Sequence, residues 1–195
     1  MKTTRQLQAE NTKKRIVAHY LDIIRERPAS EVKISELCKR ANISVGTYYY
    51  YYKDKDSVIR DIYYHIDERF IEIYKTLRAD SYVGRILEYI TYTGKEAQNY
   101  YGLRAATTIY QLQMKIEGSF FLDITRPFSQ NLCKLLNGAI AAGELRPGLD
   151  IRATTLDLLC IFRGIIYSWC LLKGEFDVEN MIHTTVAAYM NHLRG

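Results

Sequence analysis

Residues 44–56 read SVGTYYYYYKDKD and gather side chains that can bind a charged partner. The five consecutive tyrosines, Tyr48 to Tyr52, are flat amphipathic rings with hydroxyl groups, and Lys53 and Lys55 carry ammonium groups. Such groups contact phosphate oxygens and groove edges, whereas none of them forms a nucleophile and base pair. The stretch therefore indicates binding rather than catalysis.

No arrangement typical of an enzyme accompanies this stretch. The sequence contains no HExxH, P-loop, GxSxG or GxGxxG motif. Its four histidines have no partner at metal-binding spacing; they are His19, His65, His183 and His192. We therefore expect no enzyme, no catalytic residue, no metal and no cofactor.

The composition is that of a soluble globular protein with a sizeable core. Of 195 residues, 48% are hydrophobic and 25% are charged. The polar start, MKTTRQLQAENTKKR, lacks the apolar core of a secretory signal, so we expect a cytoplasmic protein. The four cysteines stand among apolar neighbours without a CxxC pair, as reduced core cysteines do; they are Cys38, Cys133, Cys160 and Cys170.

The positive charge is concentrated at one end of the chain. Residues 1–60 hold 13 Lys and Arg against 7 Asp and Glu, whereas residues 61–195 hold 14 against 15. A basic lobe on a near-neutral body favours a polyanionic partner for that lobe. The alternative is a solvated, lysine-rich surface without a partner.

The elements that would position the tyrosines are helices. Apolar residues recur at helical spacing over 11–27, and Pro28 follows, so we expect a helix there. Residues 34–41, ISELCKRA, predict a short second helix that Asn42 ends in a left-handed turn. Ser44 is a good N-cap for a third helix. A short helix, a tight turn and another short helix make a helix-turn-helix.

A helix starting after Ser44 assigns the tyrosines to different faces. Tyr48 and Tyr52 are four apart and share one face, and we expect Tyr48, Tyr50 and Tyr52 to pack inside. Tyr49 and Tyr51 are then left for a partner. Asp54 is the expected N-cap of a long fourth helix, and a cation in its first turn favours an anion such as phosphate beside Lys55.

The stretch ISELCKRANISVGTYYYYYKDKDSVI resembles the DNA-binding signature of the TetR/AcrR family of bacterial transcriptional regulators. Ser44, Gly46, Thr47, Tyr49 and Lys55 match that signature directly, and the eight residues from Thr47 to Lys55 keep its spacing. Ile43, Tyr48 and Tyr52 replace residues of similar character. The resemblance covers about a quarter of the chain.

The resemblance implies a role for each matching position. Tyr49 and Lys55 bind the phosphate backbone, and the recognition helix, about 45–51, presents Val45, Gly46, Thr47 and Tyr51 to the major groove. Val45 cannot hydrogen-bond a base, so we expect it to contact a thymine methyl group. Lys33 cannot cap the second helix but can reach a phosphate, and Ser35 is the nearby hydroxyl. The predicted DNA-binding set is Lys33, Ser35, Ser44, Val45, Gly46, Thr47, Tyr49, Tyr51 and Lys55.

The rest of the chain predicts helices only, about nine in all, so the fold class is all-α. We expect a helix-turn-helix DNA-binding domain over 1–56 and a helical effector-binding and dimerisation domain over 57–195. Glycine and proline in GELRPGLD predict a loop over 143–150. The later helices are expected at 54–77, 83–97, 102–116, 128–142, 151–172 and 178–193.

The segment 151–172 is nearly long enough to span a bilayer. Asp157 and Arg163 interrupt it, however, and each is costly at bilayer depth, so we expect a buried helix and no membrane partner. By resemblance, this helix and the last one pair with their twins in a homodimer, the alternative being intramolecular core. The expected interface is Ile161, Gly164, Ile165, Ser168, Leu172, Met181, Val186 and Tyr189.

TetR-like proteins typically hold a small molecule between the helices that follow the DNA-binding domain. The alternative for aromatic and methionine side chains is ordinary core packing. Arg163 in an apolar helix needs a partner, which is Asp157, another acidic side chain or an anionic ligand. The predicted lining set is Tyr63, Phe70, Tyr89, Tyr92, Tyr110, Met114, Phe121, Arg163 and Trp169.

The function that these expectations favour is sequence-specific regulation of transcription. The preferred hypothesis is a homodimeric repressor that an unknown small-molecule effector releases from palindromic, double-stranded operator DNA. One alternative is a TetR-like coregulator that binds a protein and no operator. The other is a non-specific, architectural DNA-binding protein, which would not need a large apolar second domain.

Overall fold

The computed structural model describes residues 3–115 and 120–194. These residues contain nine α-helices and no β-strand, which confirms the all-α class. The expected end of one helix at Ile116 lies outside the described residues. The helices are α1 Thr4–Glu26, α2 Ile34–Arg40, α3 Val45–Tyr51, α4 Ile59–Lys75, α5 Tyr82–Glu96, α6 Gly102–Gln113, α7 Pro127–Ala141, α8 Ile151–Leu171 and α9 Val178–His192.

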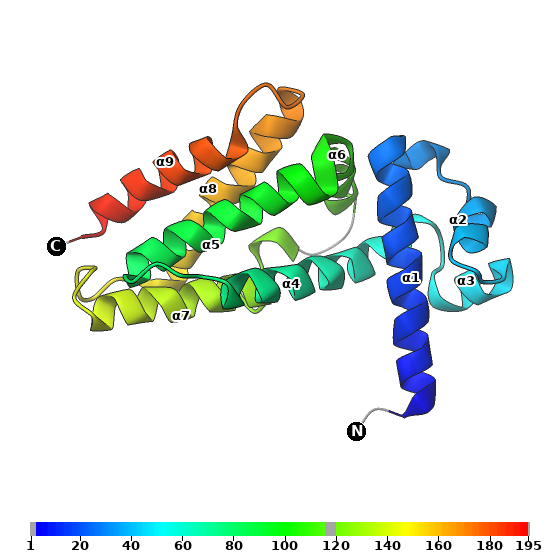
Figure 1. Ribbon diagram of the computed structural model, residues 1–195, viewed down its shortest axis with the longest axis horizontal. Coiled ribbons are helices and arrows are strands. Elements are labelled where there is room, and N and C mark those ends of the chain that lie inside the picture. The colour runs from blue at the N-terminus through cyan, green and yellow to red at the C-terminus, as the bar shows by residue number, and fades with distance from the viewer. Residues whose placement is uncertain (1–2, 116–119, 195) are drawn as a thin grey trace.

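Helix α1 begins seven residues earlier than the apolar pattern predicts. Thr3 caps it, because its hydroxyl accepts from the backbone N–H of Gln6 at 3.3 Å while the Gln6 side chain accepts from the Thr3 N–H at 2.8 Å. This reciprocal pair is a capping box. Since the first three turns are polar and exposed, hydrophobic periodicity could not reveal them. The resulting α1 extends well beyond the small lobe that it helps to build (Figure 1).

The first three helices share a core with the start of α4. Tyr20 of α1, Leu37 of α2 and Tyr48 of α3 are fully buried, and Ile59 and Ile62 of α4 close the cluster. Helix α2 packs against both α1 and α3, and α1 packs against α4. The predicted helix-turn-helix is therefore present as a small lobe at one end of the molecule (Figure 1).

The fourth helix does not begin at Asp54 as expected. A 3₁₀ turn, Asp56–Val58, comes first, and α4 begins at Ile59. Asp54 caps this turn instead, because its carboxylate accepts from the Ser57 backbone N–H at 2.8 Å and from the Ser57 hydroxyl at 2.7 Å. Lys55 therefore does not lie in the first turn of α4, and the helix-dipole argument for an anion beside it was wrong.

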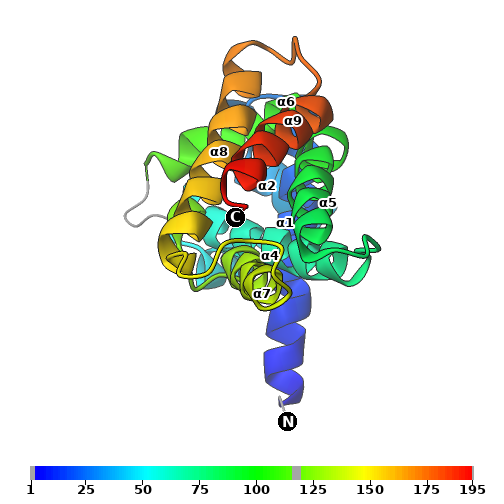
Figure 2. The ribbon, with the colours of Figure 1, turned by 90° about the vertical axis from the view of Figure 1, so that its left-hand side faces the viewer.

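The larger lobe is a bundle in which α5 and α8 are the central helices. Helix α5 packs against α7 and α9, and α8 packs against α6, α7 and α9. Helix α4 runs from the small lobe along this bundle, and α1 also packs against α6 (Figure 1). Viewed along the bundle, the first turns of α1 project beyond the other helices (Figure 2). The two lobes are thus joined both by the chain and by packing.

A π-helical turn, Ala97–Tyr101, links α5 to α6 and was not predicted. Gly102 follows it with a φ of 76°, a conformation that favours glycine. The turn places the Tyr100 ring between two guanidinium groups, 4.6 Å from Arg25 of α1 and 3.9 Å from Arg69 of α4. Cation–π contacts of this kind tie the small lobe to the bundle.

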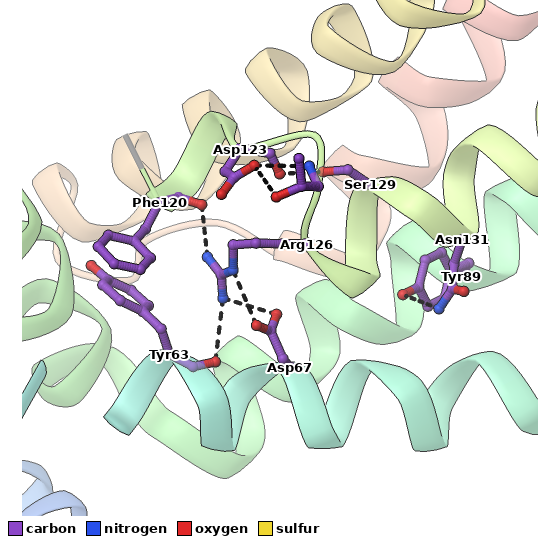
Figure 3. A network of polar contacts seen from close by, with 9 residues as sticks. Tyr63, Asp67, Tyr89, Phe120, Asp123, Arg126, Ser129 and Asn131 are labelled. Carbon is purple, nitrogen blue, oxygen red and sulfur yellow. Dashed lines mark hydrogen bonds and ion pairs between the residues drawn. The ribbon is translucent and has the colours of Figure 1, made fainter. Parts of the chain in front are cut away.

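A buried ion pair joins α4 to the start of α7 (Figure 3). Arg126 donates to both carboxylate oxygens of Asp67, at 3.1 and 2.9 Å, and to the backbone oxygens of Phe120 at 2.7 Å and Tyr63 at 3.3 Å. The two side chains are only 10% and 11% exposed. Burial raises the pKa of Asp67, and the charge of Arg126 opposes that shift. Arg126 therefore holds the Phe120 segment against α4.

We expect Arg126→Met to lower the free energy of unfolding by about 3–5 kcal/mol, because it leaves the Asp67 carboxylate buried without a partner. Urea unfolding measures this change. The double variant Arg126→Met/Asp67→Leu should regain most of the loss, and Arg104→Met, at an exposed site, should be neutral. Equal stability of Arg126→Met and the native chain would contradict the proposed role of the pair.

Helix α8 is the one described helix long and apolar enough to cross a membrane by length and composition, with a mean hydropathy of 1.3. A core helix passes the same test, so this is weak evidence for a membrane. The Gly143 to Asp150 segment is a loop, as expected, with Gly143 and Gly148 at positive φ. Cys160 is exposed rather than placed in the core, because it lies on the outer face of α8.

Candidate nucleic-acid interface and cavity

The turn between α2 and α3 has the geometry that its residues predict. Asn42 adopts a φ of 51°, the left-handed conformation that asparagine tolerates. The Ile43 N–H donates to the Cys38 carbonyl at 3.0 Å, and the Asn42 N–H donates to the Lys39 carbonyl at 3.2 Å. This pair of bonds is a Schellman motif, which satisfies the end of α2 and fixes the angle at which α3 leaves it.

Ser44 caps α3, as expected. Its hydroxyl accepts from the Thr47 backbone N–H at 2.9 Å and lies 2.8 Å from the Thr47 hydroxyl. No side-chain cap is present on α2, where Lys33 occupies the N-cap position and neither Lys33 nor Ser35 bonds to the helix start. Both side chains are exposed and free to meet a partner. The cap thus preorganises the exposed first turn of α3, which carries Val45 and Gly46.

The tyrosine run divides between core and surface. Tyr48 and Tyr52 are 0% and 4% exposed, which confirms that they pack inside. Tyr49 is 54% exposed, and Tyr51 is half-buried. The expectation that Tyr50 packs inside was wrong, because its side chain is 71% exposed on the outer face of α3. Val45, Gly46, Tyr49 and Tyr50 therefore form one continuous exposed face, the recognition face.

The hydroxyls of the two buried tyrosines fasten α3 to the segment that follows it. Tyr48 donates to the Asp54 carbonyl at 3.2 Å, and Tyr52 donates to the Asp61 carboxylate at 2.5 Å. Asp61 also pairs with Lys13 of α1 at 3.1 Å. Burial raises the pKa of both tyrosines, so both remain protonated donors at neutral pH. The recognition face is consequently held from behind by α1 and α4.

Lys55 is bound within the chain. Its ammonium group donates to the backbone oxygens of Ala29 at 2.9 Å and Ser30 at 3.1 Å, in the link between α1 and α2. Since an ammonium group has three donors, one is left for a phosphate. Its phosphate contact stays a prediction, whereas its tether to the α1–α2 link is a structural role that the sequence did not reveal.

We expect Lys55→Met to lower the free energy of unfolding by about 1 kcal/mol, because it leaves two backbone oxygens without their donor. Urea unfolding measures the loss. Lys53→Met removes the same charge at an exposed neighbouring site and should leave stability unchanged. If the two variants were equally stable, the Lys55 hydrogen bonds would contribute nothing to the free energy of unfolding.

A groove lies beside the recognition face, between α1 and α3. It has a volume of about 520 Å³, and its lining includes Arg5 and Arg15 of α1 together with Tyr50 and Tyr51. The first turns of α1 thus place two guanidinium groups next to the tyrosine run. Sequence reasoning missed both arginines, although the charge excess of residues 1–60 was the signal that could have found them.

A small cavity lies within the larger lobe, between α4, α5, α6 and α8. Its volume is about 40 Å³, and four of the predicted lining residues face it: Phe70, Tyr110, Phe121 and Arg163. Its polar lining groups are Arg163 and the hydroxyls of Thr93, Tyr101 and Tyr110, and the other walls are apolar.

The remaining predicted lining residues lie elsewhere. Tyr63 is buried next to the cavity, with its ring stacked on Phe120 at 5.0 Å. Tyr89 and Trp169 are buried in the bundle, and the Tyr89 hydroxyl accepts from Asn131 at 3.2 Å (Figure 3). Tyr92 and Met114 do not line the cavity, because their side chains are 38% and 87% exposed.

Comparison with known proteins agrees with the geometry of the small lobe. A family model for bacterial regulatory proteins of the tetR family matches residues 21–62. Residues 21–62 are therefore similar to this family, and the lobe that contains them is called the tetR-type domain below. The match includes the whole turn, the recognition face of the tetR-type domain and Lys55, but it ends before the cavity. A comparison with curated proteins found no match.

Solved structures extend the similarity from the tetR-type domain to the whole fold. The fatty acid degradation regulator FadR from Bacillus halodurans has a TM-score of 0.70 at 17% identity, covering 93% of this chain and 99% of its own. FadR from Bacillus subtilis, in complex with stearoyl-CoA, has a TM-score of 0.67 at 18% identity, covering 90% and 96%. A structure described as the molecular basis for control of antibiotic production by bacterial hormones has a TM-score of 0.75 at 17% identity, covering 94% and 98%. These similarities show the fold.

The outer surface of α8 and α9 carries most of the predicted dimer residues. Leu172 and Met181 are 52% and 42% exposed, and a Cβ added to Gly164 would meet no atom within 4 Å. Val186 is fully buried in the chain, so the structure contradicts its assignment to an interface. The outer face comprises Ile161, Gly164, Ile165, Ser168, Leu172, Met181 and Tyr189.

Proposed function

We propose that this protein is a homodimeric repressor of transcription that reads operator DNA with α3 and leaves it when a small molecule binds. The observation that carries the proposal is the recognition face. Val45, Tyr49 and Tyr50 remain exposed on a capped helix whose opposite side is anchored in the core. Exposed rings and an apolar side chain on a rigid helix are typical of a binding surface.

The side chains of the recognition face suit different parts of DNA. The Tyr49 hydroxyl contacts a phosphate and sets the register, whereas Val45 meets a thymine methyl in the major groove. Gly46 lets the backbone approach closely, since its Cα carries no side chain. Thr47 has a smaller role than expected, because its hydroxyl already lies 2.8 Å from Ser44. Arg5 and Arg15 add phosphate contacts from α1.

The best test is a mobility shift at moderate salt with the DNA immediately upstream of the protein's coding region. We expect the native chain to prefer this duplex over a scrambled duplex of equal length. Tyr49→Ala should weaken binding at least about tenfold, because one charge-assisted hydrogen bond is lost. Tyr92→Ala is the matched control, since Tyr92 is exposed on α5 in the other lobe.

The outcomes separate the alternatives. Equal binding to both duplexes would support an architectural, non-specific role. No binding to this or other candidate operators would favour a TetR-like coregulator with a protein partner. The presence of Thr47, Tyr49 and Lys55, which match the DNA-binding signature, speaks against the coregulator.

Reading palindromic DNA requires two recognition helices about 34 Å apart, and so a dimer. The outer face of α8 and α9 is proposed as the interface. Small residues, Gly164 and Ser168, allow a second helix to approach between larger apolar neighbours. Because the partner's copy of the same face would cover it, a two-fold arrangement satisfies both surfaces.

We expect Gly164→Glu to convert the dimer to a monomer in sedimentation equilibrium, because the new carboxylate lies where the partner helix must approach. The fold itself should persist, with helical content unchanged by circular dichroism, since the added Cβ meets no neighbour within 4 Å. Asn137→Glu, at an exposed site on α7, should remain dimeric. A Gly164→Glu variant that stayed dimeric would place the interface elsewhere.

Release from the operator is proposed as a shift between two forms of the dimer. The effector must bind the form that cannot engage DNA more tightly, because only differential affinity moves such an equilibrium. The cavity of the larger lobe is the proposed effector site, and the stearoyl-CoA held by FadR from Bacillus subtilis supports a small-molecule role for this fold. With DNA as partner, the proposed location is the cytoplasm.

A further inference from the structure

Arg163 occupies an unusual position for a cation. It lies in the middle of α8 and lines the cavity, with its guanidinium carbon 4.3 Å from the centroid of the Phe121 ring and 5.0 Å from that of Phe162. Its Nε is buried and donates to no atom of the described residues. Burial lowers the pKa of Arg163, but a guanidinium remains protonated at neutral pH. The cavity therefore contains a positive charge with an unused donor.

The acidic residues that could neutralise Arg163 are engaged elsewhere. Asp157, on the same helix, accepts from the Tyr189 hydroxyl at 2.6 Å on the exposed side of α8. Asp67 is the acid whose charge acts on Arg163, but both of its oxygens are taken by Arg126. Arg126 and Arg163 are thus both attracted by the Asp67 carboxylate, but only Arg126 is bonded to it. Within residues 3–115 and 120–194, Arg163 forms no ion pair.

A second unpaired donor belongs to another residue that lines the same cavity. The Tyr101 hydroxyl, from the π-helical turn, is buried and has no hydrogen-bond partner in the described part of the chain. Burial raises the pKa of Tyr101, so the hydroxyl keeps its proton. By contrast, the Tyr110 and Thr93 hydroxyls at the cavity both donate to backbone oxygens. Unpaired buried donors cost free energy, which an acceptor supplied from outside would recover.

We propose that Arg163 and Tyr101 bind the headgroup of an anionic amphiphile, with one carboxylate or phosphate and an apolar body. This inference rests on the proposed effector site and names the chemical class of its ligand. A single excess positive charge matches a single anionic group, and oxygen acceptors match the two donors. The apolar walls formed by Phe70, Ile109 and Ile166 receive the body.

The size of the cavity sets how the ligand enters. A volume of about 40 Å³ holds little more than a water molecule. The ligand must therefore displace side chains, and Phe121 is the side chain that covers the guanidinium from a three-residue turn, Phe120–Leu122. Replacing one ring contact of Arg163 by a charge-assisted hydrogen bond favours that displacement.

Isothermal titration calorimetry on the purified full-length chain, without DNA, tests the headgroup. The probes are decanoate, decyl phosphate and 1-decanol, which share one apolar body. We expect at least one anion to bind the native chain about tenfold or more tightly than 1-decanol. The better anion identifies the headgroup. Equal affinity for 1-decanol and both anions would overturn the proposal.

Two variants assign the effect to the named donors. Arg163→Met should bind the anion and 1-decanol within about twofold of each other, and Tyr101→Phe should weaken anion binding about fivefold while leaving 1-decanol unchanged. Arg152→Met, at an exposed site on α8, should retain the full preference for the anion. An Arg163→Met variant that kept the preference would refute the assignment.

A stability measurement separates a ligand contact from a structural role. Because the Arg163 Nε is buried without a hydrogen-bond partner among the described residues, Arg163→Met should raise the melting temperature of the ligand-free chain. A lower melting temperature would mean that Arg163 has a structural partner and would count against the proposal. Since none of these measurements uses DNA, failure of the mobility shift would remove the repressor hypothesis and leave the headgroup result standing.

Discussion

The burial of Tyr48 and Tyr52 is the constraint on which the small lobe depends. These rings lie four residues apart on α3, so burying both fixes which side of that short helix meets the core. Their hydroxyls then bond to Asp54 and Asp61, which ties α3 to the start of α4. A seven-residue helix is too short to be stable alone, and these contacts supply what its own backbone cannot. Every exposed side chain of the recognition face takes its direction from them.

Local chemistry allowed much of this lobe to be predicted from the sequence. Asn42 and Ser44 act on backbone groups within a few residues, so their conformations follow from residue type and position. The same holds for the loop of 143–150 and for α5, α7, α8 and α9, whose predicted ends lie within one residue of the observed ones, whereas the start of α4 was predicted five residues too early. Tyr50 was assigned wrongly, because it lies two residues from both Tyr48 and Tyr52 and helical geometry turns it away from the face that these two share.

The contacts that the sequence could not reveal join residues far apart in the chain. Lys55 bonds to carbonyl oxygens 25 and 26 residues away, and Arg126 bonds to a carboxylate 59 residues away. Residue type says only that such groups need partners. Cavity lining is harder still, because Phe70 and Met114 are both apolar and only tertiary packing separates the buried one from the exposed one. The sequence drew attention to Arg163 as a cation in an apolar helix, but only the structure shows that Asp157 and Asp67 bond to other residues.

Two arginines of the larger lobe, Arg126 and Arg163, differ in how fully their donors are used. The guanidinium of Arg126 donates to Asp67 and to two backbone oxygens. Arg126 therefore fixes α7 and the Phe120 segment against α4. Arg163 forms no ion pair among the described residues, and its Nε is buried without a hydrogen-bond partner. Helix α4, which follows the helix-turn-helix, carries Asp67 of that ion pair and lines the cavity through Ile66 and Phe70.

The position of Trp169 gives this chain an intrinsic optical reporter. It is the sole tryptophan and is 4% exposed. Its indole lies near Gly174, which follows α8, and near Leu103 of α6. Its Nε1 has no hydrogen-bond partner among the described residues and its side chain is buried, so we expect the emission of an indole in apolar surroundings. Because α8 also carries the outer face and the unpaired arginine, any rearrangement of that helix changes the surroundings of a single fluorophore. Trp169 fluorescence can therefore report rearrangement of the bundle without an added label.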